Sequence, residues 1–149
     1  MMKLSGKELP VPIIQGGMGV GISLSKLAGA VAKCGGMGVI SSANIGFHEP
    51  DFETATTEAN LRALTREIQK AKEIAGGNGL IGVNIMVASA IYKEYCDTAV
   101  AAGADAIISG AGLPLKLPQS TKGSNTLCAP IVSSGRAAAL LCKTYDRQF

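Results

Sequence analysis

The chain has 149 residues, the length of one ordinary domain, and is 47% hydrophobic with mean hydropathy +0.28. Its net charge of +3, with no lysine or arginine cluster and no aromatic platform, gives no support for a nucleic-acid partner. No apolar run reaches membrane-spanning length, and Met1-Met2-Lys3 leads into no signal-like segment. We therefore expect a cytoplasmic protein that binds neither nucleic acid nor membrane.

The cysteines and the single histidine predict no metal site. The four cysteines form no CxxC pair, and His48 has no cysteine near it in the sequence. Each cysteine lies in an apolar or helical context, which predicts reduced thiols in the core. The cysteines are Cys34, Cys96, Cys128 and Cys142.

The first predicted elements are a polar lead-in over residues 1–10 and a buried strand over residues 11–15. Four glycines follow within six positions, at residues 16–21. Glycine lacks Cβ, so it takes positive φ and lets another group approach the backbone closely. At the carboxyl end of a strand in a parallel α/β protein, such a loop either holds a ligand or is a tight turn.

An amphipathic helix follows, with Ser23 as its expected N-cap and Gly35 as its expected end. The next strand covers residues 38–42, and a long connection over residues 42–57 is a candidate lid or substrate loop. A helix over residues 58–75 carries a charged, solvated outer face.

The third strand covers residues 80–87 and is apolar except for Asn84. A buried amide must be hydrogen-bonded or it costs about 1–3 kcal/mol, so either a neighbouring backbone group or a ligand pairs with Asn84. Ser89 is expected to cap the next helix, and Gly103 is expected to end it.

The remaining predicted elements are a strand over residues 104–109, at most one helical turn within residues 115–125, a strand over residues 127–133 and a helix over residues 136–146. Five βα units in a row imply a parallel sheet with right-handed crossovers. The fold class is α/β, and two architectures fit: a complete doubly wound open sheet, or part of a (β/α)₈ barrel, which needs about 250 residues.

Five stretches carry a resemblance to a known family. They are Gln-Gly-Gly-Met-Gly and Gly-Gly-Met-Gly-Val-Ile within residues 12–47, Gly-Val-Asn-Ile-Met-Val at 82–87, Ile-Ile-Ser-Gly-Ala-Gly-Leu-Pro at 107–114, and Pro-Ile-Val-Ser-Ser-Gly-Arg at 130–136. In this order they resemble the N-terminal part of the nitronate monooxygenase family. That resemblance implies a partial TIM (β/α)₈ barrel of about five βα units with parallel strands.

The resemblance also implies FMN as the cofactor. By family position, Gly17, Met18 and Gly19 lay their backbone against the flavin ring, and Asn84 hydrogen-bonds it. Gly110 and Ser134 line the same end of the barrel, or else belong to simple βα turns.

Residues 1–149 match only the N-terminal portion of a single FMN-binding barrel domain. The family's catalytic histidine and its phosphate-binding loops lie further along the barrel, and His48 does not match that histidine, so we assign no catalytic residue. We therefore expect a truncated chain that is inactive alone.

The implied activity is oxidation of alkyl nitronates with O₂. An FMN-dependent enoyl-acyl-carrier-protein reductase, acting on an enoyl thioester, is the alternative. A reading of another class is a non-catalytic half-barrel that self-associates through exposed sheet edges. A flavodoxin-like domain is a weaker reading, because residues 16–21 fit neither phosphate-loop pattern.

Overall fold

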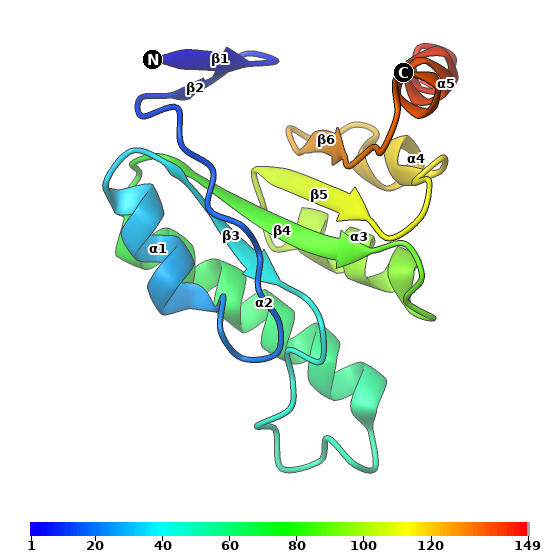
Figure 1. Cartoon of the computed structure of the whole chain (residues 1–149). Coiled ribbons are helices and arrows are strands. Elements are labelled where there is room, and N and C mark those ends of the chain that lie inside the picture. The colour runs from blue at the N-terminus through cyan, green and yellow to red at the C-terminus, as the bar shows by residue number, and fades with distance from the viewer. Residues whose placement is uncertain (149) are drawn as a thin grey trace.

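Four parallel strands form the centre of this computed structural model, which describes residues 1–148 (Figure 1). Their order in the sheet is the order of the chain: β3 (Met37–Ser41), β4 (Leu80–Met86), β5 (Ala106–Gly110) and β6 (Leu127–Pro130). Each pair of neighbouring strands is parallel. The structure thus confirms the prediction of an α/β fold with the strand arrangement of a partial TIM barrel.

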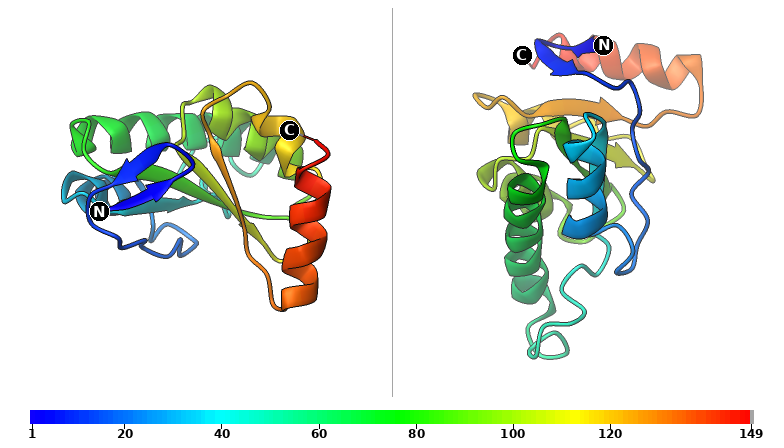
Figure 2. Two further views of the ribbon diagram at one scale, coloured as in Figure 1. Left: turned by 90° about the horizontal axis from the view of Figure 1, so that it is seen from above. Right: turned by 90° about the vertical axis from the view of Figure 1, so that its left-hand side faces the viewer.

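One helix precedes β3, one lies between each pair of successive strands of this sheet, and one follows β6. The helices are α1 (Ser25–Lys33), α2 (Thr56–Ala75), α3 (Tyr92–Ala101), α4 (Leu117–Thr121) and α5 (Gly135–Tyr145). Helices α1, α2 and α3 cover one face of the sheet (Figures 1 and 2). No helix within residues 1–148 is long and apolar enough to cross a membrane.

The core has two parts because strand side chains alternate between the two faces. On the helix side, fully buried Ile40, Val83 and Ile107 pack against the helices. On the inner side, Val39 lies level with Gly82, which lies level with Ala106. The inner side corresponds to the interior of a barrel.

Helix α1 lies unusually close to β3, and Gly38 makes this approach possible. A Cβ atom at Gly38 would stand 1.8 Å from the carbonyl oxygen of Ala28. No side chain fits there, so the glycine fixes how closely this helix packs on the sheet.

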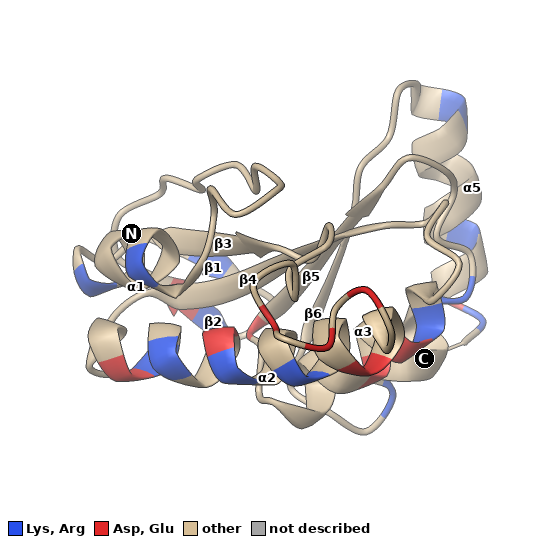
Figure 3. Cartoon of the chain, turned by 90° about the horizontal axis from the view of Figure 1, so that it is seen from below, with Lys and Arg blue, Asp and Glu red and all other residues tan. Residues whose placement is uncertain are grey.

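Charged residues lie along the outer surface of α2, as the sequence predicted for a solvated face. Figure 3 shows basic and acidic residues along this helix, which are lysine, arginine and glutamate, while the four strands of the parallel sheet carry no charged residue. Its apolar residues face the other way and are buried, among them Leu64 and Ile68.

The first ten residues were predicted as a polar lead-in, and that prediction was wrong. They form an antiparallel hairpin of β1 (Met2–Leu4) and β2 (Lys7–Leu9). Leu9 is fully buried against Met37 and Leu80, at the amino ends of β3 and β4. The hairpin therefore covers one end of the inner face.

Asp105 fixes this hairpin to the sheet. Its carboxylate accepts hydrogen bonds from Lys7 Nζ at 2.9 Å, from Lys72 Nζ at 3.3 Å and from the backbone N–H of Ile81 at 2.9 Å. Burial raises the pKa of Asp105, but these bonds and the two lysine charges outweigh it and hold the pKa below its ordinary value.

The first strand, predicted over residues 11–15, is present only as an extended segment beside β3. It has one parallel bridge, between Ile14 and Met37, and backbone bonds such as Met37 N–H to the Ile13 carbonyl at 2.9 Å. The prediction of a buried strand was wrong, since Ile13 is 61% exposed. Within residues 1–148, the segment has a hydrogen-bonded neighbouring strand on one side only.

Glycine ended the helices where the sequence predicted, but the two serine N-caps were wrong. Gly35, Gly76 and Gly103 follow α1, α2 and α3 with φ of +90°, +60° and +81°. Helix α1 has Leu24 as its N-cap and α3 has Ile91, and neither makes a side-chain cap bond. Ser23 is used elsewhere, as described below.

The prediction of core thiols holds for Cys96, which is buried, and fails for Cys34 and Cys142, which are exposed. Cys34 is the C-cap residue of α1 and Cys142 lies on α5, and both residues are exposed. All four cysteines are free thiols.

Candidate functional site

The candidate site lies where the parallel strands end. Because all four strands run the same way, their carboxyl ends meet at one edge of the sheet. We call this edge the mouth and define it by the glycine loop (residues 16–21), Ser41, Asn84 and Gly110. Five of the six residues predicted for cofactor binding belong to the mouth: three in the glycine loop, Asn84 and Gly110.

Two side chains, Gln15 and Ser23, hold the glycine loop in shape. Gln15 Oε1 accepts the backbone N–H of Val39 at 3.0 Å, and its Nε2 donates to Ser23 Oγ at 3.0 Å. Ser23 Oγ in turn accepts the N–H of Met18 at 2.9 Å. Sequence analysis missed the role of both residues, because it placed Gln15 only at the end of a strand and predicted Ser23 as a helix N-cap. The available signal was a glutamine at the end of an apolar strand, whose amide needs partners.

The loop crosses the strand ends so closely that side chains have no room there. A Cβ atom at Gly17 would stand 2.7 Å from Asn84 Cβ, and one at Gly19 would stand 3.0 Å from Ser41 Oγ. Glycine at these positions is therefore required by the protein's own packing, a reason the sequence analysis did not give.

The other side of the loop is open. No atom comes within 4 Å of a Cβ built at Gly16, and Met18 is 61% exposed. The backbone N–H groups of Gly17 and Gly19 donate to no acceptor within residues 1–148. By contrast, both backbone groups of Met18 are paired with Ser23: the Met18 N–H donates to Ser23 Oγ, and the Met18 carbonyl accepts the Ser23 N–H. Only the side chain of Met18 is therefore free to contact a ligand.

Asn84 lies beside this loop and is half-buried. Its register partners in the sheet are Ser41 and Ile108, so its side chain faces the inner side. Its amide makes no hydrogen bond to any residue in the described part of the chain, 1–148. The sequence left two partners open for this amide, a neighbouring backbone group or a ligand. The structure shows no backbone partner for it within residues 1–148.

Gly110 and Ser134 have structural partners of their own. The Gly110 carbonyl accepts the N–H of Val87 at 2.8 Å, and the Ile131 side chain lies 3.0 Å from where its Cβ would be. Ser134 caps α5 by accepting the N–H of Ala137 at 3.2 Å. Their role in cofactor binding stays a prediction.

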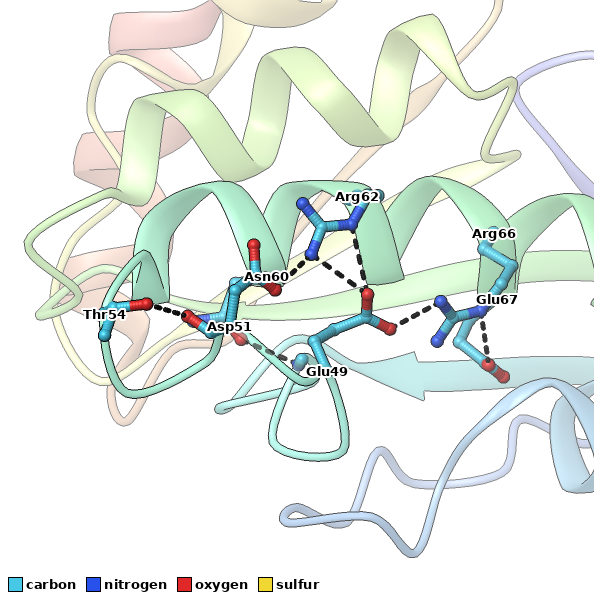
Figure 4. A network of polar contacts seen from close by, with 8 residues as sticks. Glu49, Asp51, Thr54, Asn60, Arg62, Arg66 and Glu67 are labelled. Carbon is cyan, nitrogen blue, oxygen red and sulfur yellow. Dashed lines mark hydrogen bonds and ion pairs between the residues drawn. The ribbon is translucent and has the colours of Figure 1, made fainter.

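The connection from β3 to α2, predicted as a lid or substrate loop, is fastened to α2 (Figure 4). Glu49 pairs with Arg66 at 2.5 Å and with Arg62 at 3.1 Å, and Asn60 Oδ1 accepts the N–H of Gly46 at 2.8 Å. Hydrogen bonds from Arg66 and then Arg62 hold the pKa of Glu49 below its ordinary value.

Phe47, in the connection from β3 to α2, lies next to the glycine loop of the mouth. Its ring lies 2.6 Å from the position a Cβ would take at Gly21, and it stacks on exposed His48 with ring centroids 3.7 Å apart. Within residues 1–148, no group of three or more His, Cys, Asp or Glu side chains could hold a metal ion.

A large hollow lies at the opposite end of the sheet from the mouth. It measures about 840 Å³ and is lined by the hairpin at Leu4 and Lys7, by Met37 and Ala106 at the starts of β3 and β5, and by residues 124–129. It is the inner face of the curved sheet, open between the 11–15 segment and β6. It includes none of the predicted cofactor residues.

The sheet has the topology of a TIM barrel, so the chain is a barrel-type α/β protein. The glycine loop and the unpaired side-chain amide of Asn84 lie at the carboxyl ends of its strands and form a candidate ligand site at the mouth. The sequence model of the nitronate monooxygenase family matches residues 2–146. The chain belongs to that family, a family of flavin-dependent oxidoreductases.

Solved structures agree with the fold. FabK from Thermotoga maritima, a TIM-barrel enzyme, matches with TM-score 0.70 and 23% sequence identity over 89% of this chain and 37% of that chain. Its M276A mutant matches equally well, over 40% of that chain. This chain thus spans less than half the length of both structures. A search of curated proteins returns no match.

Proposed function

We propose that the protein is an FMN-dependent oxidoreductase of the nitronate monooxygenase type, and that residues 1–149 supply the N-terminal portion of one FMN-binding barrel. The family match over residues 2–146 supports this activity. The mouth would contribute the part of the site that faces the isoalloxazine ring.

The observation that carries the proposal is the unpaired amide of Asn84 beside unpaired backbone donors. Asn84 offers one acceptor and two donor hydrogens, and the N–H groups of Gly17 and Gly19 add two more donors. The edge of a flavin ring has carbonyl oxygens and ring nitrogens that need such partners. The residues present therefore fit the group.

FMN, when bound, supplies the redox chemistry, and the protein supplies position and electrostatics. Asn84 would orient the ring edge, while Gly17 and Gly19 let the backbone lie flat against it. Gln15 and Ser23 would fix the loop so that these donors are already in place before binding. The exposed Met18 side chain would cover part of the ring.

The proposed substrate is an alkyl nitronate, which O₂ oxidises to a carbonyl compound and nitrite. The alternative is an enoyl thioester reduced with NADH, because the structural neighbour FabK is an FMN-dependent enoyl-acyl-carrier-protein reductase. The family match favours the nitronate, since the likeness to FabK at 23% identity shows the fold alone. Nitronate-dependent oxygen uptake and enoyl-dependent NADH oxidation distinguish the two.

The cofactor proposal is tested by titrating the protein with FMN and following flavin fluorescence. We expect Asn84→Ala to weaken FMN binding about tenfold, the loss of one or two hydrogen bonds. Asn78→Ala is the matched control, because Asn78 is exposed and contacts Lys33 at the other end of the sheet. Equal affinity of both variants, or no FMN-dependent signal in the parent protein, contradicts the proposal.

A second proposal, of another class, is that this chain alone is a non-catalytic half-barrel that self-associates. The outer edge of β6 and the outer edge of the 11–15 segment carry no strand partner within residues 1–148. Exposed apolar side chains lie at both, including Ile13 and Ile131. Unpaired edges of this kind are templates for another chain.

Sedimentation at several protein concentrations tests the second proposal. We expect the average mass to rise with concentration and FMN to bind weakly. A monomer that binds FMN tightly and stoichiometrically contradicts it.

The cytoplasm remains the proposed location, supported by four free cysteines.

A further inference from the structure

The curved sheet has two free borders, and both line the same hollow. One border is the 11–15 segment and the other is β6, since neither has a strand on its outer side within residues 1–148. Ile14 of the segment and Ala129 of β6 both line the hollow of about 840 Å³ described above. The two borders are therefore the two rims of that hollow.

The backbone of β6 directs alternate residues toward its free side. The N–H of Leu127 donates to the carbonyl of Asp105 at 2.9 Å, so the backbone groups of Leu127 belong to the pairing with β5. Because residues of a parallel strand bond to its two neighbours alternately, the N–H and carbonyl of Cys128 point to the free side. Pro130 adds a carbonyl there but has no N–H.

The other border is arranged in the same way. The N–H of Gln15 donates to the Met37 carbonyl at 3.0 Å, and the N–H of Met37 donates to the Ile13 carbonyl at 2.9 Å. Residues 13 and 15 therefore bond β3, and the N–H and carbonyl of Ile14 point to the free side. Pro12 offers only a carbonyl there. Each border thus has one strand donor with carbonyls beside it.

The outer layer of the protein leaves an apolar side chain open at each border. Ile13 points to the outer side, because Ile14 lines the hollow, and it is 61% exposed. Helix α5 stands beyond β6, at the border of the sheet (Figures 1 and 2). Leu141 is the one buried residue of α5, and Leu140 beside it is 47% exposed.

The borders are free of charge and large enough for a specific interface. Residues 11–15 and 127–133 include no lysine, arginine, aspartate or glutamate, so contact between them buries no ion. Covering the exposed apolar side chains of both borders in two copies removes on the order of 1,000 Å² from water, the size at which specific interfaces begin. These side chains are Val11, Ile13, Ile14, Ile131, Val132 and Leu140.

We propose that two copies of this chain close into one ring, related by a twofold axis parallel to the strands. Strand β6 of each copy lies parallel to the 11–15 segment of its partner. The N–H of Cys128 donates to the carbonyl of the partner's Pro12, and the N–H of the partner's Ile14 donates to the carbonyl of Cys128. Helix α5 then covers the partner's Ile13 with Leu140.

The ring has a fixed size because its two contacts use every free border. No border remains for a third copy, whereas pairing β6 with β6 leaves both 11–15 segments open. With four strands and one extended segment from each copy, the ring is wider than an eight-stranded TIM barrel. This inference rests on the second proposal above, that the chain self-associates, and it names the partner and the stoichiometry.

Sedimentation velocity of the flavin-free protein over a wide range of concentrations tests the proposal. We expect one equilibrium between monomer and dimer, with an average mass that levels off at twice 15.2 kDa. A mass that continues to rise beyond two copies overturns the closed ring and leaves self-association intact. A monomer at every concentration overturns both.

Two variants with matched controls test the contacts. Ile14→Pro removes the N–H that bonds the partner and keeps the bonds to β3, so its dimer dissociation constant should exceed that of Ile14→Ala about tenfold. Leu140→Lys should also weaken the dimer about tenfold relative to the parent. Met86→Lys is its control, because Met86 is 45% exposed on the inner strand β4, and it should associate as the parent does.

Circular dichroism first establishes that each variant is folded. The proposed ring is overturned if Ile14→Pro associates as tightly as Ile14→Ala, or if Leu140→Lys associates as tightly as Met86→Lys. Because all measurements use protein without flavin, failure of the FMN proposal does not affect the result.

Discussion

Replacing Gln15 by alanine tests how the glycine loop is held. The change removes the acceptor for the N–H of Val39 and the donor to Ser23, each at 3.0 Å. Val39 is fully buried, so its N–H finds no water and costs about 1–3 kcal/mol. The lost bond to Ser23 adds about 1 kcal/mol. We therefore expect Gln15→Ala to lower the free energy of unfolding by about 2–4 kcal/mol.

Urea unfolding followed by circular dichroism measures this difference. For a domain with about 5–15 kcal/mol of stability, such a loss moves the midpoint clearly. Gln119→Ala is the control, since Gln119 is an exposed glutamine on α4, and it should stay within about 0.5 kcal/mol of the parent. If Gln15→Ala costs no more than Gln119→Ala, the reasoning about the loop is refuted.

Two further predictions concern stability. Asp105→Asn should cost about 1–3 kcal/mol at neutral pH. The hydrogen bonds from Ile81 and Lys7 lower the pKa of Asp105 in the folded state. Its carboxylate therefore stabilises the protein at pH values above the ordinary pKa of 3.8, and this contribution is lost as the pH falls below that value. Urea unfolding at several pH values measures the free energy of unfolding of this variant and of the parent. If the difference between the two persists in acid, the proposed pairing of Asp105 is contradicted. Gly38→Ala should cost about 3 kcal/mol or more, because its Cβ would overlap α1, whereas Gly135→Ala, with nothing within 4 Å, should raise the melting temperature slightly.

The sequence predicted the sheet well because each of its strands is a short, mostly apolar run without a charged residue. Limits of the four strands and the long helix differ by at most three residues from those predicted. The hairpin was missed because its strands, Met2–Leu4 and Lys7–Leu9, have only three residues each. The signal was alternation around Ser5 and Gly6, both of which take positive φ.

Serine roles could not be assigned from position alone. Ser23 precedes α1 as an N-cap would, but its hydroxyl bonds Met18 in the glycine loop, while Ser134, predicted for the cofactor, is the residue that caps a helix. Ser23 and Ser134 both stand just before a helix in the sequence. Only the path of the loop that precedes each serine decides whether its hydroxyl caps the helix or bonds the loop. Asn84 could be singled out because a polar amide in an apolar strand is conspicuous in the sequence itself, but its role in cofactor binding came from the family resemblance and stays a prediction.

The β1–β2 hairpin has a practical consequence for work on this protein. Leu9 anchors the hairpin over the first residues of β3 and β4, so Met1 emerges at the end of the sheet remote from the glycine loop. A purification tag or a fluorescent label joined to the amino terminus is therefore kept away from the mouth. Probes intended to sense ligands belong instead on the exposed side chain of Met18.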